Sequence, residues 1–254
     1  MKILLFFFCT GLLTAGEAQL YFQQGNDALR RGNYRDALLF YRKAETGAES
    51  FKLFFNMGNC WFKIFQTQEQ PRGALAYAVL YYRKAQLIKN DEDVQVNLAF
   101  AREHRLDAFE EHEPNILLKT FFFFYYNFNL HQLTLAALFF FAFSCIFLSL
   151  FFIGSGKTYR SIMFRIFVIG ILCWSGTFLS ALIRYRADYA RLQGVLLSEK
   201  IELKNAPGDD YSAAYQIHEG AEFVIKEERG DWALVMMPGG QTGWLTKSNI
   251  AYVR

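Results

Sequence analysis

The chain has 254 residues, of which 53% are apolar and 18% aromatic, and it contains 28 Phe but only 4 Cys. The aromatic content excludes a disordered chain, and the few cysteines exclude a disulfide-stapled scaffold. A net charge of +3 is too small for a nucleic-acid-binding protein without a concentrated basic patch, so we expect no nucleic-acid partner.

The first 18 residues have the pattern of a secretory signal peptide. Lys2 precedes a short apolar core, and Gly16 and Ala18 are the small residues that a cleavage site requires. The apolar run is shorter than the ~20 residues of a membrane span. An uncleaved anchor and a lipoprotein signal at Cys9 are the alternatives.

Residues 19–105 contain an internal repeat. The motif Phe-Tyr-Arg-Lys-Ala at 40–44 returns as Tyr-Tyr-Arg-Lys-Ala at 81–85, and a Gly-Asn pair precedes each copy, at 25–26 and 58–59. Small residues and aromatics at this spacing resemble the tetratricopeptide repeat, in which paired helices stack into an array with a concave groove. We therefore expect two helix-turn-helix units.

The tetratricopeptide resemblance implies a binding scaffold rather than an enzyme. We expect a helix over 93–105 to cap the array, and about eight extra residues around 66–73 set the second unit apart. Asn26 and Asn56 occupy positions of the family's carboxylate clamp, but Phe22, Asp93 and Asn97 stand in place of its basic members. The candidate groove residues, which are either a ligand site or only a polar face, are Phe22, Asn26, Arg30, Phe55, Asn56, Asn59, Phe62 and Lys63.

The middle of the chain predicts a two-helix transmembrane hairpin. No charged side chain occurs over 120–156, which is too long for one span of ~20 residues. We interpret 106–129 as a linker that ends in an aromatic interfacial segment, because aromatic side chains favour the membrane surface. The two spans are then 130–153 and 161–183, joined by a loop at 154–160.

Charge and the signal peptide together predict the orientation. Lys157 and Arg160 make the loop basic, which favours the cytoplasm, although Arg184, Arg186 and Arg191 follow the second span. The signal peptide favours export of the segment after it. We therefore expect a protein of the bacterial inner membrane, embedded in the lipid bilayer, with both water-soluble parts in the periplasm.

After a linker at 184–193, residues 194–254 predict a small all-β barrel. Five short apolar runs are separated by Gly-rich and Pro-rich turns. Gly-Asp-Trp at 230–232 and Gly-Trp-Leu at 243–245 resemble bacterial Src-homology-3-like domains, which bind peptides or cell-wall material. The candidate ligand-face residues are Tyr211, Tyr215, Trp232 and Trp244. We expect the tyrosines to be exposed in a long loop, whereas core filling is the commoner use of such tryptophans.

Signals for catalysis are weak. Gly-Ser-Gly-Lys-Thr at 154–158 resembles the end of a phosphate-binding loop, but Phe151 replaces the leading glycine and no strand is predicted before it. No Cys/His cluster has zinc spacing. Cys60 lies in a predicted helix, where a small buried residue is the simplest interpretation. We expect no catalytic residue, no cofactor and no metal site.

The order of the parts resembles the BatE-type proteins of the bacterial Bat aerotolerance operon. The expected fold class is a multidomain membrane protein: an α-helical tetratricopeptide array, a two-helix transmembrane hairpin and a small Src-homology-3-like barrel. The resemblance implies a non-enzymatic adaptor in an envelope complex linked to oxidative-stress tolerance, with membrane-anchored von Willebrand A-type Bat proteins as partners.

Two rival functions remain open at this point. The first is a peptidoglycan-binding anchor that acts through the barrel. The second is a subunit of a membrane enzyme or transporter, against which neither span carries an ionisable residue at its centre.

Overall fold

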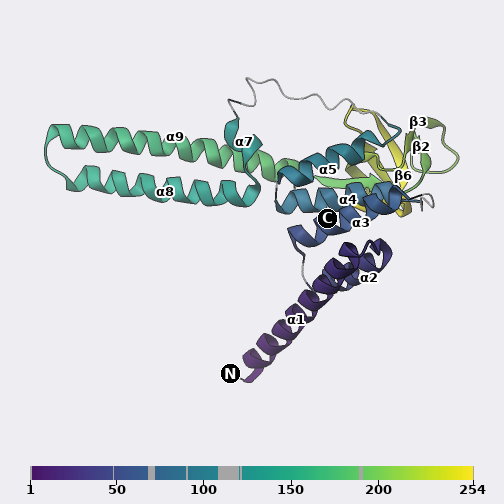
Figure 1. Ribbon diagram of the computed structural model, residues 1–254. Coiled ribbons are helices and arrows are strands. Elements are labelled where there is room, and N and C mark those ends of the chain that lie inside the picture. The colour runs from purple at the N-terminus through teal and green to yellow at the C-terminus, as the bar shows by residue number, and fades with distance from the viewer. Residues whose placement is uncertain are drawn as a thin grey trace. The chain divides into compact units, whose positions relative to one another are not determined.

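The computed structural model describes residues 2–47, 49–67, 72–89, 91–107, 120, 122–188 and 191–253. Side chains at 2–15, 187 and 188 lie outside this description, and with them most of the predicted signal peptide. The chain divides into two compact units, one made of residues 1–111 with 192–254 and the other of residues 112–191. Figure 1 shows their elements.

The first unit begins with a helical domain of two helix pairs and one further helix. Helix α1 packs against α2, α3 against α4, and α5 against α4. The Ser50 side chain caps α3 by accepting a hydrogen bond from the Leu53 N–H at 3.2 Å, and Asp91 caps α5 in the same way. The helices are α1 (Lys2–Arg30), α2 (Tyr34–Glu45), α3 (Phe51–Phe65), α4 (Ala74–Ile88) and α5 (Glu92–Glu103).

Two glycines allow the helices of each pair to approach closely. A Cβ added at Gly25 would lie 2.4 Å from the Tyr41 ring, and one at Gly58 would lie 2.6 Å from the Tyr82 ring. Both tyrosines are buried. The repeated motif found in the sequence is therefore a repeated packing unit, in which a ring fills the space that the glycine leaves open.

Cys60 lies in the same core. It is fully buried, as expected for a small apolar residue. Burial raises the pKa of the Cys60 thiol to about 12, so it stays protonated at neutral pH.

The first unit also contains an antiparallel sheet of seven strands in the order β3-β2-β6-β5-β4-β1-β7. Its core is formed by alternate residues of these strands, among them Leu203, Phe223, Val235 and Leu245. The strands are β1 (Leu192–Leu196), β2 (Lys200–Lys204), β3 (Ala213–His218), β4 (Glu222–Arg229), β5 (Trp232–Met236), β6 (Thr242–Thr246) and β7 (Ile250–Tyr252), with a 3₁₀ turn η1 (Lys247–Asn249) before the last.

Five of these strands contain the predicted apolar runs, but two were missed. Tyr215 lies in β3 and not in a loop, because β2 offers it a partner at Leu203. Ala213–His218 has few of the β-branched residues that mark a strand in sequence. Strand β7 has only three residues, which is too short to give a recognisable alternating pattern in the sequence.

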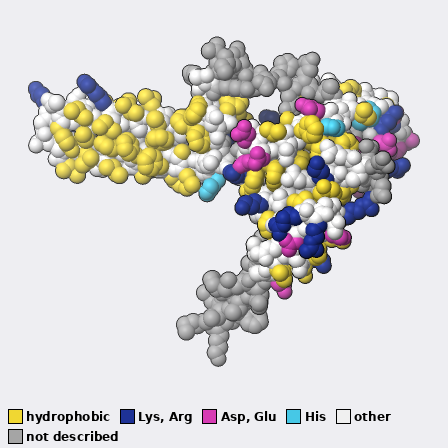
Figure 2. Space-filling view, in the orientation of Figure 1, with side chains coloured by type: hydrophobic (Ala, Val, Ile, Leu, Met, Phe, Trp, Pro, Cys, Tyr) yellow, Lys and Arg dark blue, Asp and Glu magenta, His cyan; other side chains and the backbone are white. Residues whose placement is uncertain are grey.

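The second unit is a helical hairpin preceded by a short helix. Helix α7 (Phe123–Asn127) precedes α8 (Leu130–Ile153) and α9 (Lys157–Asp188). Asn129 and Gln132 form a capping box that fixes the start of α8, whose bounds are those of the first predicted span. Both α8 and α9 are long and apolar enough to cross a membrane. Hydrophobic side chains cover most of the hairpin in Figure 2, and Lys and Arg gather at its tip.

Part of the predicted loop at 154–160 is helical. Helix α9 begins at Lys157, so only Gly154, Ser155 and Gly156 connect the two helices. Gly156 has a φ of 99°, which glycine adopts easily, and its carbonyl already accepts the Arg160 N–H at 3.1 Å. Helix α9 also extends beyond the predicted span of 161–183.

Small and hydroxyl-bearing residues lie between α8 and α9. A Cβ at Gly170 would lie 2.5 Å from the Ser144 Oγ, so the two helices touch closely there. Ser144 donates its hydroxyl to the Phe140 carbonyl at 2.7 Å, and Thr177 donates to the Cys173 carbonyl at 2.9 Å. The buried hydroxyls are thus satisfied within their own helices, each by the carbonyl four residues earlier.

Candidate functional site

A cavity of about 420 Å³ opens where α1, the start of α2, α3, α4 and α5 meet. It is lined by apolar, aromatic and amide side chains. These are Leu29, Tyr34, Asn59, Phe62, Lys63, Gln66, Tyr82, Asn97 and Phe100. Its size and mixed lining suit a segment of a protein or a small molecule.

Only three of the eight predicted groove residues line this cavity: Asn59, Phe62 and Lys63. The two other predicted aromatics are packing residues. The Phe22 ring lies 5.9 Å from the Tyr41 ring, and the Phe55 ring lies 6.1 Å from the Tyr82 ring.

The remaining three predicted residues, Asn26, Asn56 and Arg30, also have partners within the helices. Arg30 is exposed and pairs with Asp27. The Asn26 Oδ1 accepts hydrogen bonds from the Tyr41 hydroxyl at 2.8 Å and from the Asn56 Nδ2 at 2.9 Å. These two asparagines therefore join α1, α2 and α3.

The same arrangement occurs again in the second helix pair. The Asn59 Oδ1 accepts from the Tyr82 hydroxyl at 2.8 Å and from the Asn97 Nδ2 at 3.0 Å. The amide of Asn59 thus joins α3, α4 and α5. Asn97, which the sequence marks only as a departure from the clamp, closes this second network.

The second network retains unused hydrogen-bonding groups. Within the described residues, no hydrogen bond involves the Asn59 Nδ2 or the Asn97 Oδ1. One is a donor and the other an acceptor, and both belong to cavity-lining residues. Together they match the C=O and N–H groups that a peptide backbone presents.

An aromatic cluster on α3 and α5 borders the cavity. The Phe62 ring lies 5.4 Å from the Phe100 ring, and the His104 ring lies 4.9 Å from Phe100 and 5.7 Å from Phe65. Phe100 is 47% exposed although it is a large apolar residue. This cluster was not predicted. The signal was the spacing of Asn97, Phe100 and His104, which places them on one face of the capping helix.

The cavity offers one cation in its described lining, so it differs from a carboxylate clamp built on several basic side chains. Lys63 is the single basic side chain in its described lining, and its Nζ lies 3.3 Å from the Gln66 Oε1. A free C-terminal carboxylate would meet one cation here, so the arrangement favours an internal stretch of peptide.

The candidate residues of the β-domain differ from expectation at the two tryptophans, which do not belong to the core of the sheet. Tyr211 and Tyr215 are exposed, as expected. Trp232 and Trp244 lie on the face of the sheet opposite Ala233 and Leu245, which are core residues. Trp244 is buried although it lies outside the core cluster, and the Arg229 guanidinium lies 5.3 Å from the centre of its ring.

A charged cluster joins the helical domain to the β-domain. Glu222, at the start of β4, is bound by Arg102 through two hydrogen bonds of 2.7 and 2.9 Å. Arg105 donates to the same carboxylate at 3.0 Å, and Arg83 lies 3.2 Å away. The side chains of Glu222 and Arg105 are only 13% and 5% exposed. One carboxylate thus holds cations from α4, α5 and the turn after α5.

The charge cluster decides the protonation of Glu222. Burial by itself would raise the pKa of this carboxyl, but Arg102, Arg83 and Arg105 outweigh burial and hold the pKa below its ordinary value. Glu222 is therefore ionised at neutral pH, and the junction carries two net positive charges over its four side chains.

Further contacts make the two domains one body. The Glu219 Oε1 accepts the backbone N–H groups of Leu75 and Ala76 at 2.8 and 3.1 Å. It caps α4, whose own N-cap residue Gly73 has no side chain to do so. Asp107 likewise accepts the His218 N–H at 2.6 Å.

The apolar contacts agree with the polar ones. Val195, Ala251 and Val253, from β1 and the end of the chain, belong to the core of the helical domain and not to that of the sheet. The β-domain therefore packs directly on the helical domain.

Other candidate chemistry finds no support in the described part of the chain. No three His, Cys, Asp or Glu side chains there are grouped as metal ligands. Residues 154–158 follow helix α8 and not a strand, so the strand–turn–helix context of a phosphate-binding loop is missing.

Comparison with known families identifies the β-domain. Residues 199–251 match the family described as Bacterial SH3 domain. This range runs from the start of β2 into β7 and includes both tryptophans. No curated protein and no solved structure matches the chain.

Proposed function

We propose that the protein is a membrane-anchored, non-enzymatic adaptor that holds a peptide segment of a partner in the cavity between α3 and α5. The observation that carries this proposal is the pair of unused amide groups on Asn59 and Asn97 beside the exposed ring of Phe100. The amides would bind the peptide backbone, and Phe100 with Phe62 would hold an apolar side chain.

The repeat pattern supports a tetratricopeptide assignment for the helical domain. Its Gly–Tyr contacts and Asn networks recur from one helix pair to the next with nearly the same distances. Bacterial SH3 domains are binding modules as well, so both halves of this unit point to an adaptor.

The charged junction supports the hairpin topology. Arg102 precedes the two apolar helices in the chain and Glu222 follows them, yet their side chains are in contact at 2.7 Å. The two must lie on the same side of a membrane, which requires an even number of spans between them. With the signal peptide, we infer that both soluble parts are periplasmic and that the protein sits in the inner membrane.

The adaptor role agrees with the resemblance to BatE-type proteins. We propose that its partners are other membrane-anchored envelope proteins, those with von Willebrand A-type domains first among them. The link to oxidative-stress tolerance rests on the resemblance alone.

A cell-wall anchor is the second candidate, favoured by the bacterial SH3 match. Against it, Trp244 lies under Arg229 and offers no open ring face for a sugar, although Tyr211 and Tyr215 are exposed. Sedimentation of the full chain in nanodiscs with purified peptidoglycan would separate the two: co-sedimentation that Tyr215→Ala abolishes supports the anchor.

The cavity is tested by crosslinking in native membranes. A photo-reactive amino acid placed at Lys63 should capture a partner, and Asn97→Ala combined with Phe100→Ala should reduce its yield about tenfold, because both the amide and the apolar contact are lost. Tyr215→Ala, on β3, is the matched control and should leave the yield unchanged. Equal yields from all three proteins would contradict the proposal.

A further inference from the structure

We propose a second partner site, separate from the cavity, in a groove along α2 and α3 that binds a protein segment carrying carboxylate and apolar side chains. Two adjoining cavities form this groove. One, of about 650 Å³, lies at the turn between α1 and α2, and the other, of about 210 Å³, lies between α2 and α3. They share Arg35 and Ile64 in their linings.

The floor of the groove is apolar. Leu38 and Leu39 come from α2, and Trp61 and Ile64 come from α3. Leu39 is 60% exposed, which is unusual for a leucine in the middle of a helix that packs on both neighbours. An apolar side chain of a partner would cover it.

The rim of the groove is cationic. Arg35 and Arg42 are seven residues apart on α2, so they lie on the same side of the helix, two turns apart. The Arg42 guanidinium lies 5.8 Å from the centre of the Trp61 ring, and no carboxylate of the described chain forms an ion pair with it.

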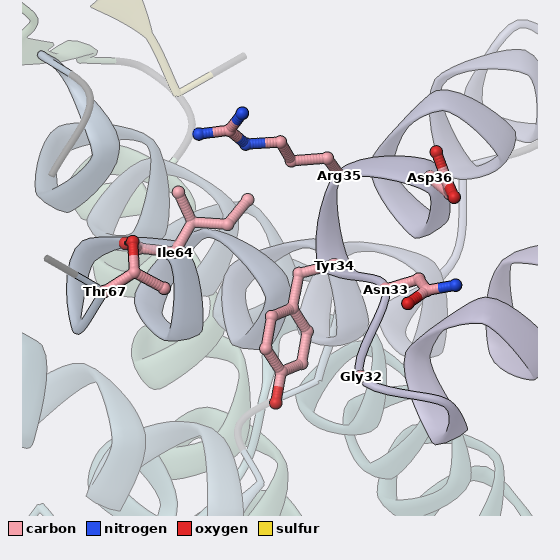
Figure 3. A pocket seen from close by; sticks show the side chains of 7 residues that line it. All are labelled: Gly32, Asn33, Tyr34, Arg35, Asp36, Ile64 and Thr67. Carbon is pink, nitrogen blue, oxygen red and sulfur yellow. The ribbon is translucent and has the colours of Figure 1, made fainter. Parts of the chain in front are cut away.

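Within the described residues, the acidic side chains of α2 form no ion pair with Arg42. Glu45 is engaged by Lys84 at 3.6 Å. Asp36 lines the larger cavity but points away from Ile64 and Thr67 in Figure 3, whereas Arg35 extends toward them. The described lining of the two cavities thus holds two arginines and one carboxylate. The charge of the groove therefore favours an acidic occupant.

The indole of Trp61 supplies an independent observation. Its Nε1–H is buried and has no hydrogen-bond acceptor among the residues that the structure describes. Such a donor costs about 1–3 kcal/mol when it is left unpaired. A carboxylate bound by Arg42 beside this ring would provide the missing acceptor once the guanidinium shifts from the indole.

The groove is distinct from the cavity of the proposed function. With 3.6 residues per turn, Trp61 projects from the side of α3 opposite Asn59 and Lys63. The two sites lie on opposite sides of one helix, so the protein can hold two segments at once.

The test uses the full chain in nanodiscs of zwitterionic lipid and a displayed library of random 12-residue peptides. We expect enrichment of peptides that combine Asp or Glu with Leu, Phe or Trp. Their affinity should fall about tenfold for both Arg42→Gln and Arg42→Glu. Lys52→Glu reverses an exposed charge at the start of α3, outside the groove, and should leave it unchanged.

Asn97→Ala separates this site from the cavity, because peptides of the groove should still bind that variant fully. The thermal unfolding of each variant shows whether it is folded. The proposal is overturned if the enriched peptides lack acidic residues, if Lys52→Glu weakens them as much as Arg42→Glu, or if anionic lipid vesicles compete for the site, which would make it a membrane contact.

Discussion

Two regions of the molecule place polar groups in partly buried surroundings. One is the junction between the helices and the β-domain, and the other is the cavity between α3 and α5. They differ in how completely the polar groups are paired within the chain. At the junction, Glu222 is matched by Arg83, Arg102 and Arg105. In the cavity, Asn59 and Asn97 satisfy one another and still retain a donor and an acceptor.

This difference separates structural polarity from binding polarity. Taking an ion out of water costs several kcal/mol, and good geometry must repay this cost within the chain. Burying a neutral amide costs much less free energy than burying an ion, so an amide can keep a hydrogen-bonding group free for a ligand. We therefore expect the junction residues to control stability and the cavity residues to control binding.

The largest expected effect is at the junction. Glu222→Ala leaves three arginines close together and without their common carboxylate, and should lower the free energy of unfolding by about 3–5 kcal/mol. Urea unfolding of the full chain in nanodiscs, followed by tryptophan fluorescence, measures it. Glu199→Ala is the matched control: Glu199 is 77% exposed and lies 4.0 Å from Arg72, so its loss should have no measurable effect. Equal losses of unfolding free energy in the two variants would contradict the assignment of a stabilising role to the junction.

Acid should act through the same carboxylate. The pKa of Glu222 is lower in the folded protein than the ordinary value of about 4.3 that it has when unfolded. Its contribution is therefore complete above the unfolded value and is lost as the pH falls through the folded one. Unfolding measured from pH 6 to pH 3 should show this loss. A Glu222→Gln protein with the same acid dependence as the wild type would be evidence against it.

A smaller effect is expected inside the helix pairs. Gly58→Ala places a Cβ 2.6 Å from the Tyr82 ring, and relief of this clash should cost about 1–3 kcal/mol of stability. Gly176→Ala in α9 is the control, because the Cβ added there would lie 3.9 Å from the Phe124 ring, an ordinary van der Waals contact. If the two variants unfold alike, the close contact between α3 and α4 is wrong.

The smallest effect concerns one hydroxyl. Tyr82→Phe keeps the ring but removes the 2.8 Å hydrogen bond to the Asn59 Oδ1, so it should cost about 1 kcal/mol. Tyr41→Phe removes the equivalent bond to Asn26 and should cost the same. A large difference between the two would show that the repeats are not equivalent.

The sequence predicts those elements whose signals are local. The apolar run from Leu130 to Ile153 gives α8 to the residue, and the repeated Gly–Tyr spacing gives the helix pairs. The start of α9 is harder to predict, because charged residues such as Lys157 and Arg160 next to glycines favour a loop prediction. Lys and Arg are nevertheless good helix formers.

The sites were harder to predict because they depend on distant contacts. Asn26 and Asn56 are residues of the kind that binds ligands. Only the fold shows that the Asn26 Oδ1 instead accepts hydrogen bonds from Asn56 and Tyr41. In the sequence Glu222 is an ordinary strand residue. Only the fold shows its contacts with arginines that lie more than one hundred positions earlier in the chain. Pairings of this kind leave no periodic trace in a single sequence.

The central claim is that the helices and the β-domain form one body, and a double-mutant cycle between Arg102 and Glu222 tests it most directly. Unfolding free energies of Arg102→Gln, Glu222→Gln and the double variant, in the full chain in nanodiscs, should give a coupling energy of at least about 1 kcal/mol. A coupling energy of zero, with the two single effects simply adding, would mean that the two domains are independent.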